Sequence, residues 1–192
     1  MGNIMDRRQR KTREAIFGAF TELLSKKEFG QITVGEIIEK ADVGRATFYA
    51  HFETKDFLLK AFCEELFCHI FDMTGDGIAG HRHIFVCEGS DSVFLHLFQH
   101  LKKNDNNILR LLSSQNNELF LRYFQMGLTR LIENQLPMFA EKKRADVPEA
   151  FWKHHILSTF MGTLKWWISN GTKESPETIT AYFMYVLGES KE

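Results

Sequence analysis

The sequence predicts an all-α protein of about nine helices, and three observations support that fold class. Apolar residues recur three and four positions apart along most of the chain, which is the spacing of a helix with one buried face. All three prolines (Pro137, Pro148 and Pro176) lie in the last third, so long helices are permitted before them. We find no convincing β-hairpin pattern, internal repeat or low-complexity tract.

The composition indicates a globular chain whose positive charge is concentrated at one end. The 192 residues are 44% hydrophobic and 26% charged, which suits one large domain or two small ones. The net charge is −1, yet residues 1–13 hold five basic side chains and one acid, so an anionic partner is expected at this end. No apolar run is long enough to cross a membrane, so no membrane partner is expected. Without a secretory signal, we expect a cytoplasmic protein in which Cys63, Cys68 and Cys87 are free thiols.

The first part of the chain predicts three helices joined by tight turns. A first helix over 12–24 carries one apolar stripe. A second helix follows Thr33, because Thr33 and Glu36 have the spacing of a capping box, which satisfies two backbone N–H groups at a helix start. After a turn over 42–44, a third helix over 45–51 has room for about two turns.

A long helix then leads into the rest of the chain. It is predicted from Lys55, with Thr54 as its N-cap, to Met73. Its apolar residues occupy two faces, which favours a strut that is buried on two sides. A glycine-containing loop is expected over 75–90. The remaining predicted helices span residues 91–103, 108–112, 118–134, 148–170 and 176–187.

The segment from Thr33 to Lys55 has the layout of a helix-turn-helix. Its second helix can enter a DNA major groove and present its first residues to base edges. Arg45 is the predicted base reader, because its guanidinium can pair with guanine O6 and N7. Phosphate contacts are expected from the side chains around it, while Phe48 and Phe52 hold the helix against the core. The predicted DNA-contacting residues are Thr33, Val34, Gly44, Arg45, Ala46, Thr47, Tyr49, His51 and Lys55.

This segment resembles the DNA-binding domain of the TetR family of bacterial transcriptional regulators. The similarity runs from about Arg10 to Phe62. The residues that carry it are Ile32-Thr33-Val34, Ala41 and Val43 in the turn, the run from Thr47 to Phe52, and Lys55.

Three positions depart from the pattern of that family. Asp42 stands where glycine is usual, but aspartate tolerates a positive φ better than most residues, so the turn is expected to survive. Gly44 stands where serine is frequent, which keeps an acceptable cap but removes a hydroxyl. Gly35 lies inside a helix at a cost of up to about 1 kcal/mol. The alternative for the whole segment is a plain three-helix unit with a solvated basic face.

The resemblance implies an all-helical homodimer with two domains. Residues 1–54 would form the DNA-binding domain, which reads a palindromic operator, and residues 55–192 would hold an effector pocket and the dimer interface. Repression is the usual output of the family. The implied partners are double-stranded DNA, a second copy of the chain and an unidentified small-molecule effector, and no cofactor is expected.

Two apolar stripes on the helix over 148–170 predict a dimer interface. One stripe can face the protomer's own core and the other a second copy, so that the last two helices of each subunit form a four-helix interface. The alternative is a helix buried entirely inside one domain. The predicted interface residues are Trp152, Ile156, Phe160, Leu164, Trp167, Ile179, Tyr182, Phe183 and Val186.

The phenylalanine-rich middle helices predict an apolar effector pocket with a few polar groups. His69, Tyr123 and His155 could supply those groups. The alternative for each of them is an ordinary core or edge residue. The predicted pocket residues are Phe62, His69, Phe98, Tyr123, Phe124 and His155.

A metal sensor and an enzyme are weaker predictions. His96 and His100 have the four-residue spacing of helical metal ligands, but they lie opposite an apolar stripe and are expected to face water. His81 and His83 lie in a loop without a matching ligand cluster, so no metal site is predicted. No phosphate loop, nucleophile elbow or carboxylate pair indicates catalysis, so no catalytic residue is predicted. A metal-responsive regulator of the same fold and a helical small-molecule-binding enzyme remain the alternatives.

Overall fold

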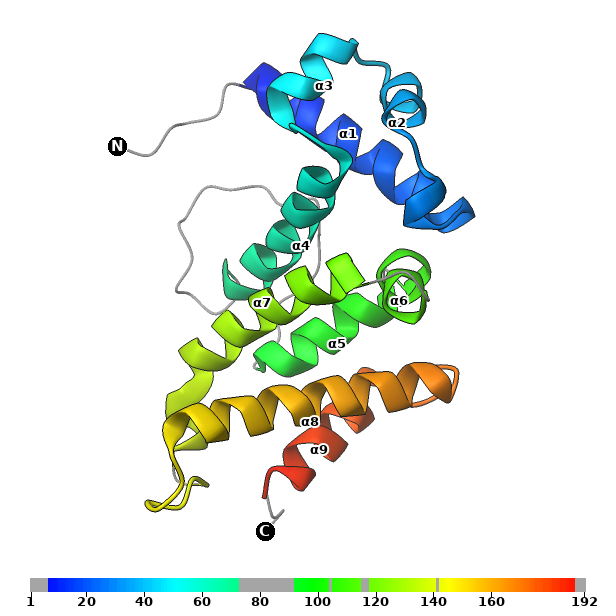
Figure 1. Cartoon of the computed structure of the whole chain (residues 1–192). Helices are drawn as coiled ribbons and strands as arrows, with labels where there is room; N and C mark the ends of the chain where they lie inside the picture. The colour runs from blue at the N-terminus through cyan, green and yellow to red at the C-terminus, as the bar shows by residue number, and fades with distance from the viewer. Residues whose placement is uncertain (1–6, 73–91, 104, 115–117, 141, 189–192) are drawn as a thin grey trace, which may run out of the picture.

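The computed structural model describes residues 7–72, 92–103, 105–114, 118–140 and 142–188. Within these ranges the chain forms nine α-helices and no β-strand, which confirms the predicted fold class (Figure 1). The predicted loop over 75–90, with His81, His83 and Cys87, lies outside the described residues. The α-helices are α1 (Arg7–Lys26), α2 (Val34–Ala41), α3 (Arg45–His51), α4 (Lys55–Asp72), α5 (Val93–Lys103), α6 (Asp105–Ser113), α7 (Glu118–Gln135), α8 (Glu149–Ser169) and α9 (Pro176–Val186). No helix in the described ranges is both long enough and apolar enough to cross a membrane.

Two short 3-10 helices, η1 (Phe29–Gln31) and η2 (Leu136–Phe139), were not expected from the sequence. The first helix is also longer than predicted, because the basic residues that precede its apolar stripe are themselves good helix formers. The predicted basic arm is therefore, from Arg7 onward, the first turns of α1.

The helices α1, α2 and α3 pack together into a unit that we call the N-terminal bundle. Its core contains Phe17 and Phe20 of α1, Ile37 of α2 and Phe48 of α3, all at most 1% exposed. An ion pair of 2.6 Å between Lys40 and Glu22 also joins α2 to α1. The hydrophobic core thus fixes the position of α3, while the polar contacts lie at the surface.

The helix α4 links the N-terminal bundle to the remaining helices, α5 to α9, which we call the helical body (Figure 1). In its N-terminal half, the ring of Phe62 lies 6.4 Å from Phe17 and 6.0 Å from Phe20 of α1. In its C-terminal half, the ring of Phe67 lies 5.3 Å from Phe124 of α7. The prediction of a strut buried on two sides is confirmed.

Close contact between α4 and α7 depends on a glycine. A Cβ atom at Gly127 would lie 2.1 Å from the ring of Phe67, so only a residue without a side chain fits at this position. Gly127 therefore lets Phe67 lie directly against the α7 backbone.

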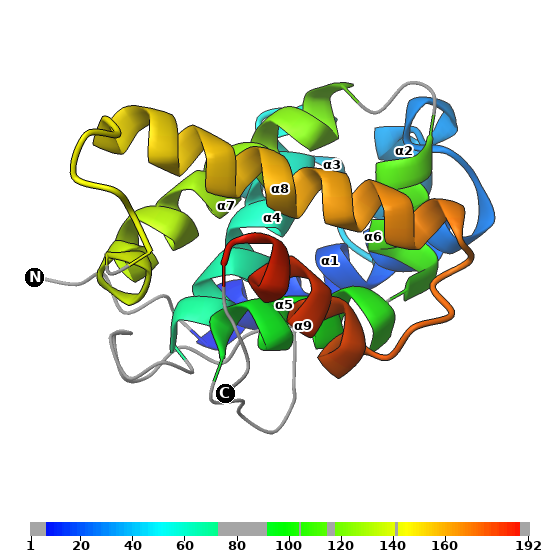
Figure 2. The same cartoon turned by 90° about the horizontal axis from the view of Figure 1, so that it is seen from below.

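The helical body is filled by aromatic rings. Phe98 of α5 stacks on Phe160 of α8 at 4.8 Å, and Phe94 of α5 lies 5.0 Å from Phe183 of α9. The helices α8 and α9 form the end of the molecule farthest from α2 and α3. Figure 2 views the molecule from that end, with α8 and α9 in front of the other helices.

Candidate functional site

The start of α2 is fixed by the capping box that the sequence predicted. The Thr33 hydroxyl oxygen accepts a hydrogen bond from the Glu36 N–H at 3.3 Å, and a Glu36 carboxylate oxygen accepts one from the Thr33 N–H at 2.9 Å. The ion pair with Lys27 is the largest cause that lowers the pKa of Glu36 to about 2, followed by the hydrogen bonds that the Thr33 N–H and the Thr33 hydroxyl donate to the carboxylate. This capping box sets where α2 begins and therefore where the turn after it lies.

The turn between α2 and α3 uses the one non-glycine left-handed residue of the N-terminal bundle. Asp42 has φ of 52° and ψ of 49°, and the N–H of Val43 donates to the Ile38 carbonyl at 3.2 Å. The expectation that aspartate supports this turn is confirmed. Gly44 then caps α3 through its carbonyl, which accepts from the Phe48 N–H at 3.0 Å, without a side-chain cap.

The helix α3 has a buried face and an exposed face. Phe48 and Phe52 are at most 3% exposed, and the Phe52 ring lies edge-on to Phe17 of α1 at 5.5 Å. Around these two anchors, four predicted DNA-contacting residues are exposed: Arg45, Ala46, Thr47 and Tyr49. These four side chains can reach a partner without a change in the core of the N-terminal bundle.

The other predicted DNA contacts differ in accessibility. Thr33 and Gly44 are exposed, whereas Val34 is half-buried against the core. His51 is also half-buried, and burial, followed by the charge of Arg13, lowers its pKa. His51 therefore favours its neutral form in the unbound protein. In that form its ring can donate a hydrogen bond to a phosphate but adds no positive charge to attract it.

Lys55 has a structural role that the sequence did not indicate. Its ammonium donates to the carbonyls of Phe29 at 2.8 Å and Ile32 at 2.7 Å, and lies 4.3 Å from the centre of the Phe29 ring. Burial lowers its pKa. Two of its three N–H donors thus hold η1 against the start of α4, which leaves one donor for a phosphate.

The basic side chains at the start of α1 do not form one uniform arm. Arg7, Arg8 and Lys11 are exposed. Arg13, in contrast, donates to the Glu65 carboxylate of α4 at 3.2 Å and lies over the rings of Phe17 and Phe52. Arg13 therefore ties α1 to α4, and its expected role as part of an anion-binding arm is corrected.

Most of the predicted dimer interface is wrong, because those side chains lie in the protomer's own core. The six that are at most 1% exposed are Ile156, Phe160, Leu164, Trp167, Ile179 and Phe183. Successive members of this set on α8 are three or four residues apart, which brings Ile156, Phe160, Leu164 and Trp167 to the same side of the helix. They therefore form one inward stripe and do not belong to two separate stripes. Of the other three, Trp152 is half-buried and packed against the core, while Tyr182 and Val186 are 50% and 65% exposed.

A different apolar surface remains exposed on α8 and α9. Phe151 and Trp166 of α8 are 62% and 46% exposed, and Tyr185 of α9 is 72% exposed. We call these three side chains, with Tyr182 and Val186, the α8–α9 apolar surface; within it the rings of Trp166 and Tyr182 lie 6.3 Å apart. Phe151, Trp166 and Tyr185 were not among the predicted interface residues, although their offset from the inward stripe was a signal that could have identified them.

The six predicted pocket residues do not line one cavity. Phe62, Phe98 and Phe124 are at most 2% exposed and pack in the core, so they are core residues rather than pocket walls. His155 is exposed and stacks on Trp152 at 5.5 Å. Of the six, only Tyr123 borders the hollow between α4 and α7, described next.

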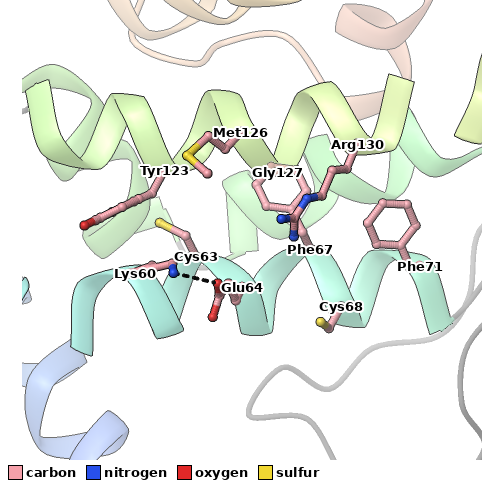
Figure 3. Close-up of a pocket in the computed structure, with 10 residues that line it drawn as sticks. All are labelled: Lys60, Cys63, Glu64, Phe67, Cys68, Phe71, Tyr123, Met126, Gly127 and Arg130. Atoms are coloured by element: carbon pink, nitrogen blue, oxygen red, sulfur yellow. Dashed lines mark ion pairs between the residues drawn. The ribbon is translucent and has the colours of Figure 1, made fainter. Parts of the chain in front are cut away.

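The hollow between α4 and α7 has a volume of about 70 Å³ (Figure 3). Cys63, Phe67 and Phe71 of α4 and Tyr123 and Met126 of α7 are among its lining residues. Ligand pockets for drug-sized molecules measure about 300–1,000 Å³, so this hollow has room for only a few water molecules. A larger molecule could enter only if α4 and α7 moved apart.

The prediction that His96 and His100 face water is wrong. Both are 1% exposed, and they meet His69 of α4, which is 4% exposed. The Nε2 atom of His100 lies 2.9 Å from that of His69 and 3.1 Å from that of His96. Burial lowers the pKa of His96, and it lowers the pKa of His100 to about 3, with the charges of the neighbouring histidines and Lys103 as further causes. The polar side of α5 is buried because α4 covers it.

Comparisons with known sequences agree with this architecture. Residues 16–62 match the family described as "Bacterial regulatory proteins, tetR family", and residues 88–188 match one described as "Transcriptional regulator C-terminal region". The uncharacterized HTH-type transcriptional regulator YxbF of Bacillus subtilis (strain 168) is 24% identical over 195 residues, with 97% of this chain and 47% of YxbF covered. The chain thus spans about half the length of that relative. A second regulator of the same organism, YvdT, is 34% identical over 70 residues, which cover 36% of this chain and 34% of YvdT.

Solved structures are similar over nearly the whole chain. A TetR transcriptional regulator from Streptococcus agalactiae 2603V has a TM-score of 0.71 and 34% identity, with 97% of this chain and 98% of that chain covered. The regulator FadR from Bacillus subtilis, in complex with stearoyl-CoA, has a TM-score of 0.61 and 18% identity, with coverage of 93% and 98%. The second similarity is one of fold alone. The matched proteins are transcriptional regulators and not enzymes.

Proposed function

The chain belongs to the TetR family of bacterial transcriptional regulators, and we propose that it is a repressor that binds a palindromic operator as a homodimer and responds to a small-molecule effector. The observation that carries this proposal is the exposed face of α3, whose buried face is anchored by Phe48 and Phe52. In this proposal residues 1–54 form the DNA-binding domain and residues 55–192 form the effector-binding and dimerisation domain. The proposed contacts with DNA are Thr33, Val34, Gly44, Arg45, Ala46, Thr47, Tyr49, His51 and Lys55.

Arg45 is the proposed base-reading residue. Its exposed position at the start of α3 allows the guanidinium to form two hydrogen bonds to one guanine. Exposed Thr47 and Tyr49 are suited to thymine methyl or phosphate contacts around it. Two such helices in a symmetric dimer would read half-sites about 34–36 Å apart, so the enriched sites should have dyad symmetry.

Selection from a random duplex library, followed by affinity measurements at two salt concentrations, tests DNA recognition. We expect the wild type to enrich a palindrome and to bind it with a steep salt dependence. Arg45→Ala should reduce the preference for that palindrome over a random duplex by about tenfold or more, since one two-bond contact contributes about 1–3 kcal/mol of discrimination. Arg144→Ala, which removes an exposed arginine of the helical body, is the control and should leave the preference unchanged. Equal discrimination by Arg45→Ala and the wild type would contradict the proposal.

The α8–α9 apolar surface is the proposed dimer interface. Five large side chains from two adjacent helices are exposed there, which is unusual for a surface that only contacts water. A two-fold interface uses the same surface of both subunits, so one substitution in the sequence alters the interface at two places. Sedimentation should therefore give a wild-type mass of twice 22.4 kDa, and Tyr185→Glu should shift it toward the single-chain mass. Phe57→Glu changes an exposed aromatic residue of α4 and serves as the control; an undisturbed dimer in Tyr185→Glu would refute this interface.

The effector is proposed to act by moving α4. A molecule that enters the helical body between α4 and α7 has to displace Phe67 from Gly127, and α4 carries the N-terminal bundle. An effector that prefers the displaced state lowers DNA affinity by the same factor by which DNA lowers effector affinity.

A further inference from the structure

Three histidines from two helices meet inside the protein, away from the DNA-contacting residues. His69 lies near the end of α4, and His96 and His100 lie one turn apart on α5. All three are at most 4% exposed. Neutral imidazole is the commonest metal ligand among protein side chains, so a buried cluster of three imidazoles is a candidate metal site.

The ring nitrogens converge in the manner of metal ligands. The Nε2 atom of His100 lies 2.9 Å and 3.1 Å from those of His69 and His96, and no two ligand atoms of the cluster are more than 4.8 Å apart. Three nitrogens at about 2.0–2.1 Å from a tetrahedral zinc ion lie about 3.3 Å from one another. The two short separations differ from that value by a few tenths of an ångström, and side-chain rotation would have to bring the His69 and His96 nitrogens, which lie within 4.8 Å of each other, to the same spacing.

The two short contacts at the His100 Nε2 atom compete with each other. A neutral imidazole nitrogen is either a donor with one N–H or an acceptor with one lone pair. If the His100 Nε2 atom carries the proton, it can donate well to one neighbour only; if it does not, one lone pair must accept from two directions. One of the two short contacts is then poor in either tautomer, whereas a cation can accept the lone pairs of all three nitrogens.

We propose that His69, His96 and His100 bind one divalent transition-metal ion, with zinc as the ion that fits best. Imidazole ligands suit zinc, copper and nickel, and a pair of histidines four residues apart on a helix presents both rings to one ion. In the part of the chain that the structure describes, no further Cys, His, Asp or Glu belongs to the cluster. A catalytic-type or open zinc site has three protein ligands and a fourth position for water or another ligand, which three histidines would satisfy.

A metal at this site would join α4 to the helical body. His69 belongs to the helix that carries the N-terminal bundle, and the other two ligands belong to α5. Metal binding would fix the C-terminal half of α4 and so change the population of the DNA-binding arrangement. This regulatory consequence rests on the proposed function, whereas the metal site itself does not.

The test uses the full chain after removal of metal with a chelator. Cobalt(II) is titrated first, because its visible absorption reports tetrahedral coordination, and zinc is then added to displace it. We expect one equivalent per chain for the wild type and for His154→Gln, which removes an exposed histidine. His100→Gln should weaken binding by more than about a hundredfold, because even groups that only orient metal ligands contribute about 10–100-fold.

Several outcomes decide the proposal. A wild type that takes up less than one equivalent, or a His100→Gln variant that binds as tightly as the wild type, overturns the site. If His100→Gln does not fold, His69→Gln gives the same comparison from the α4 side, and a zinc-dependent rise in the melting temperature should be lost with it. Metal binding that leaves DNA affinity unchanged overturns only the regulatory link. Failure to bind DNA in both metal states would instead contradict the proposed function.

Discussion

The N-terminal bundle carries its polar functional groups at the surface, whereas the helical body buries a polar cluster in its interior. In the N-terminal bundle the phenylalanines are inside, and the polar groups that can meet DNA, such as Arg45 and Tyr49, are outside. In the helical body the polar His100 is inside, while Trp166 and Tyr185 are exposed. The comparison teaches that stability and recognition can be separated by mutation in the first region, but are coupled in the second.

The largest expected effect tests that separation within α3. Phe48→Ala removes a fully buried ring and should lower the free energy of unfolding by about 3–5 kcal/mol. Tyr49→Ala changes the neighbouring residue, which is 46% exposed, and should alter stability by less than about 0.5 kcal/mol. Its DNA affinity should nevertheless fall by about tenfold on all sequences, because a hydrogen bond to a phosphate is lost. Chemical denaturation and fluorescence anisotropy measure the two quantities.

A loss of stability in Tyr49→Ala as large as that in Phe48→Ala would show that the two faces of α3 are not independent. The proposed division of labour in the N-terminal bundle would then fail, even if both variants bound DNA weakly.

The second prediction examines coupling at the contact between α4 and α7. Gly127→Ala places a methyl group 2.1 Å from Phe67, and such overpacking typically costs about 1–3 kcal/mol of unfolding free energy. Because α4 must shift, DNA affinity should decrease as well. Gly18→Ala, in a helix with nothing within 4 Å of the new methyl group, is the matched control and should stabilise by about 0.5–1 kcal/mol. A Gly127→Ala variant with unchanged stability and DNA affinity would contradict the coupling.

The third prediction concerns the pH dependence of the capping box. The pKa of Glu36 is about 2 in the folded protein, below the ordinary glutamate value of 4.5, so folding favours its ionised form. The stability that Glu36 contributes should be complete above pH 4.5 and disappear as the pH falls toward 2. Glu36→Gln cannot titrate, so its unfolding free energy should differ from that of the wild type at pH 7 and approach it in acid. If the difference in unfolding free energy between the wild type and Glu36→Gln grew as the pH fell, the lowered pKa of Glu36 would be contradicted.

The smallest expected effect is that of Gly44→Ser at the start of α3. A side chain fits there, because the nearest atom to an added Cβ is the Thr47 hydroxyl oxygen at 3.5 Å. Serine caps a helix better than glycine by only a few tenths of a kcal/mol, so the melting temperature should rise slightly. The added hydroxyl should raise DNA affinity on all sequences alike, which a comparison of selected and random duplexes can measure.

The N-terminal bundle was largely predictable because its structure is determined by local signals. Thr33 and Glu36 are three residues apart, and Asp42 lies directly between the two short helices, so no distant contact is needed to interpret them. Lys55 is the exception, because its two carbonyl acceptors lie more than twenty residues earlier in the chain.

The helical body was predictable only as a set of helices. The pattern of α5 correctly predicted one apolar face, but an amphipathic pattern cannot tell whether another helix covers the polar face. The burial of His96 and His100 depends on α4, which precedes them by more than twenty residues. Likewise, the pattern of α8 does not distinguish a stripe that faces the protomer's own core from one that faces a second copy.

One contact between α6 and α1 limits how the N-terminal bundle can move. The guanidinium of Arg110 donates to the Ser25 carbonyl at 2.7 Å, near the end of α1. The N-terminal bundle is thus attached to the remainder of the chain at two separated points, one through α4 and one through Arg110. With these two attachments, the N-terminal bundle can tilt about the line that joins them, but it cannot easily rotate about the axis of α4. In the proposed dimer, an effector that moves α4 should therefore change the separation of the two α3 helices more readily than their relative rotation.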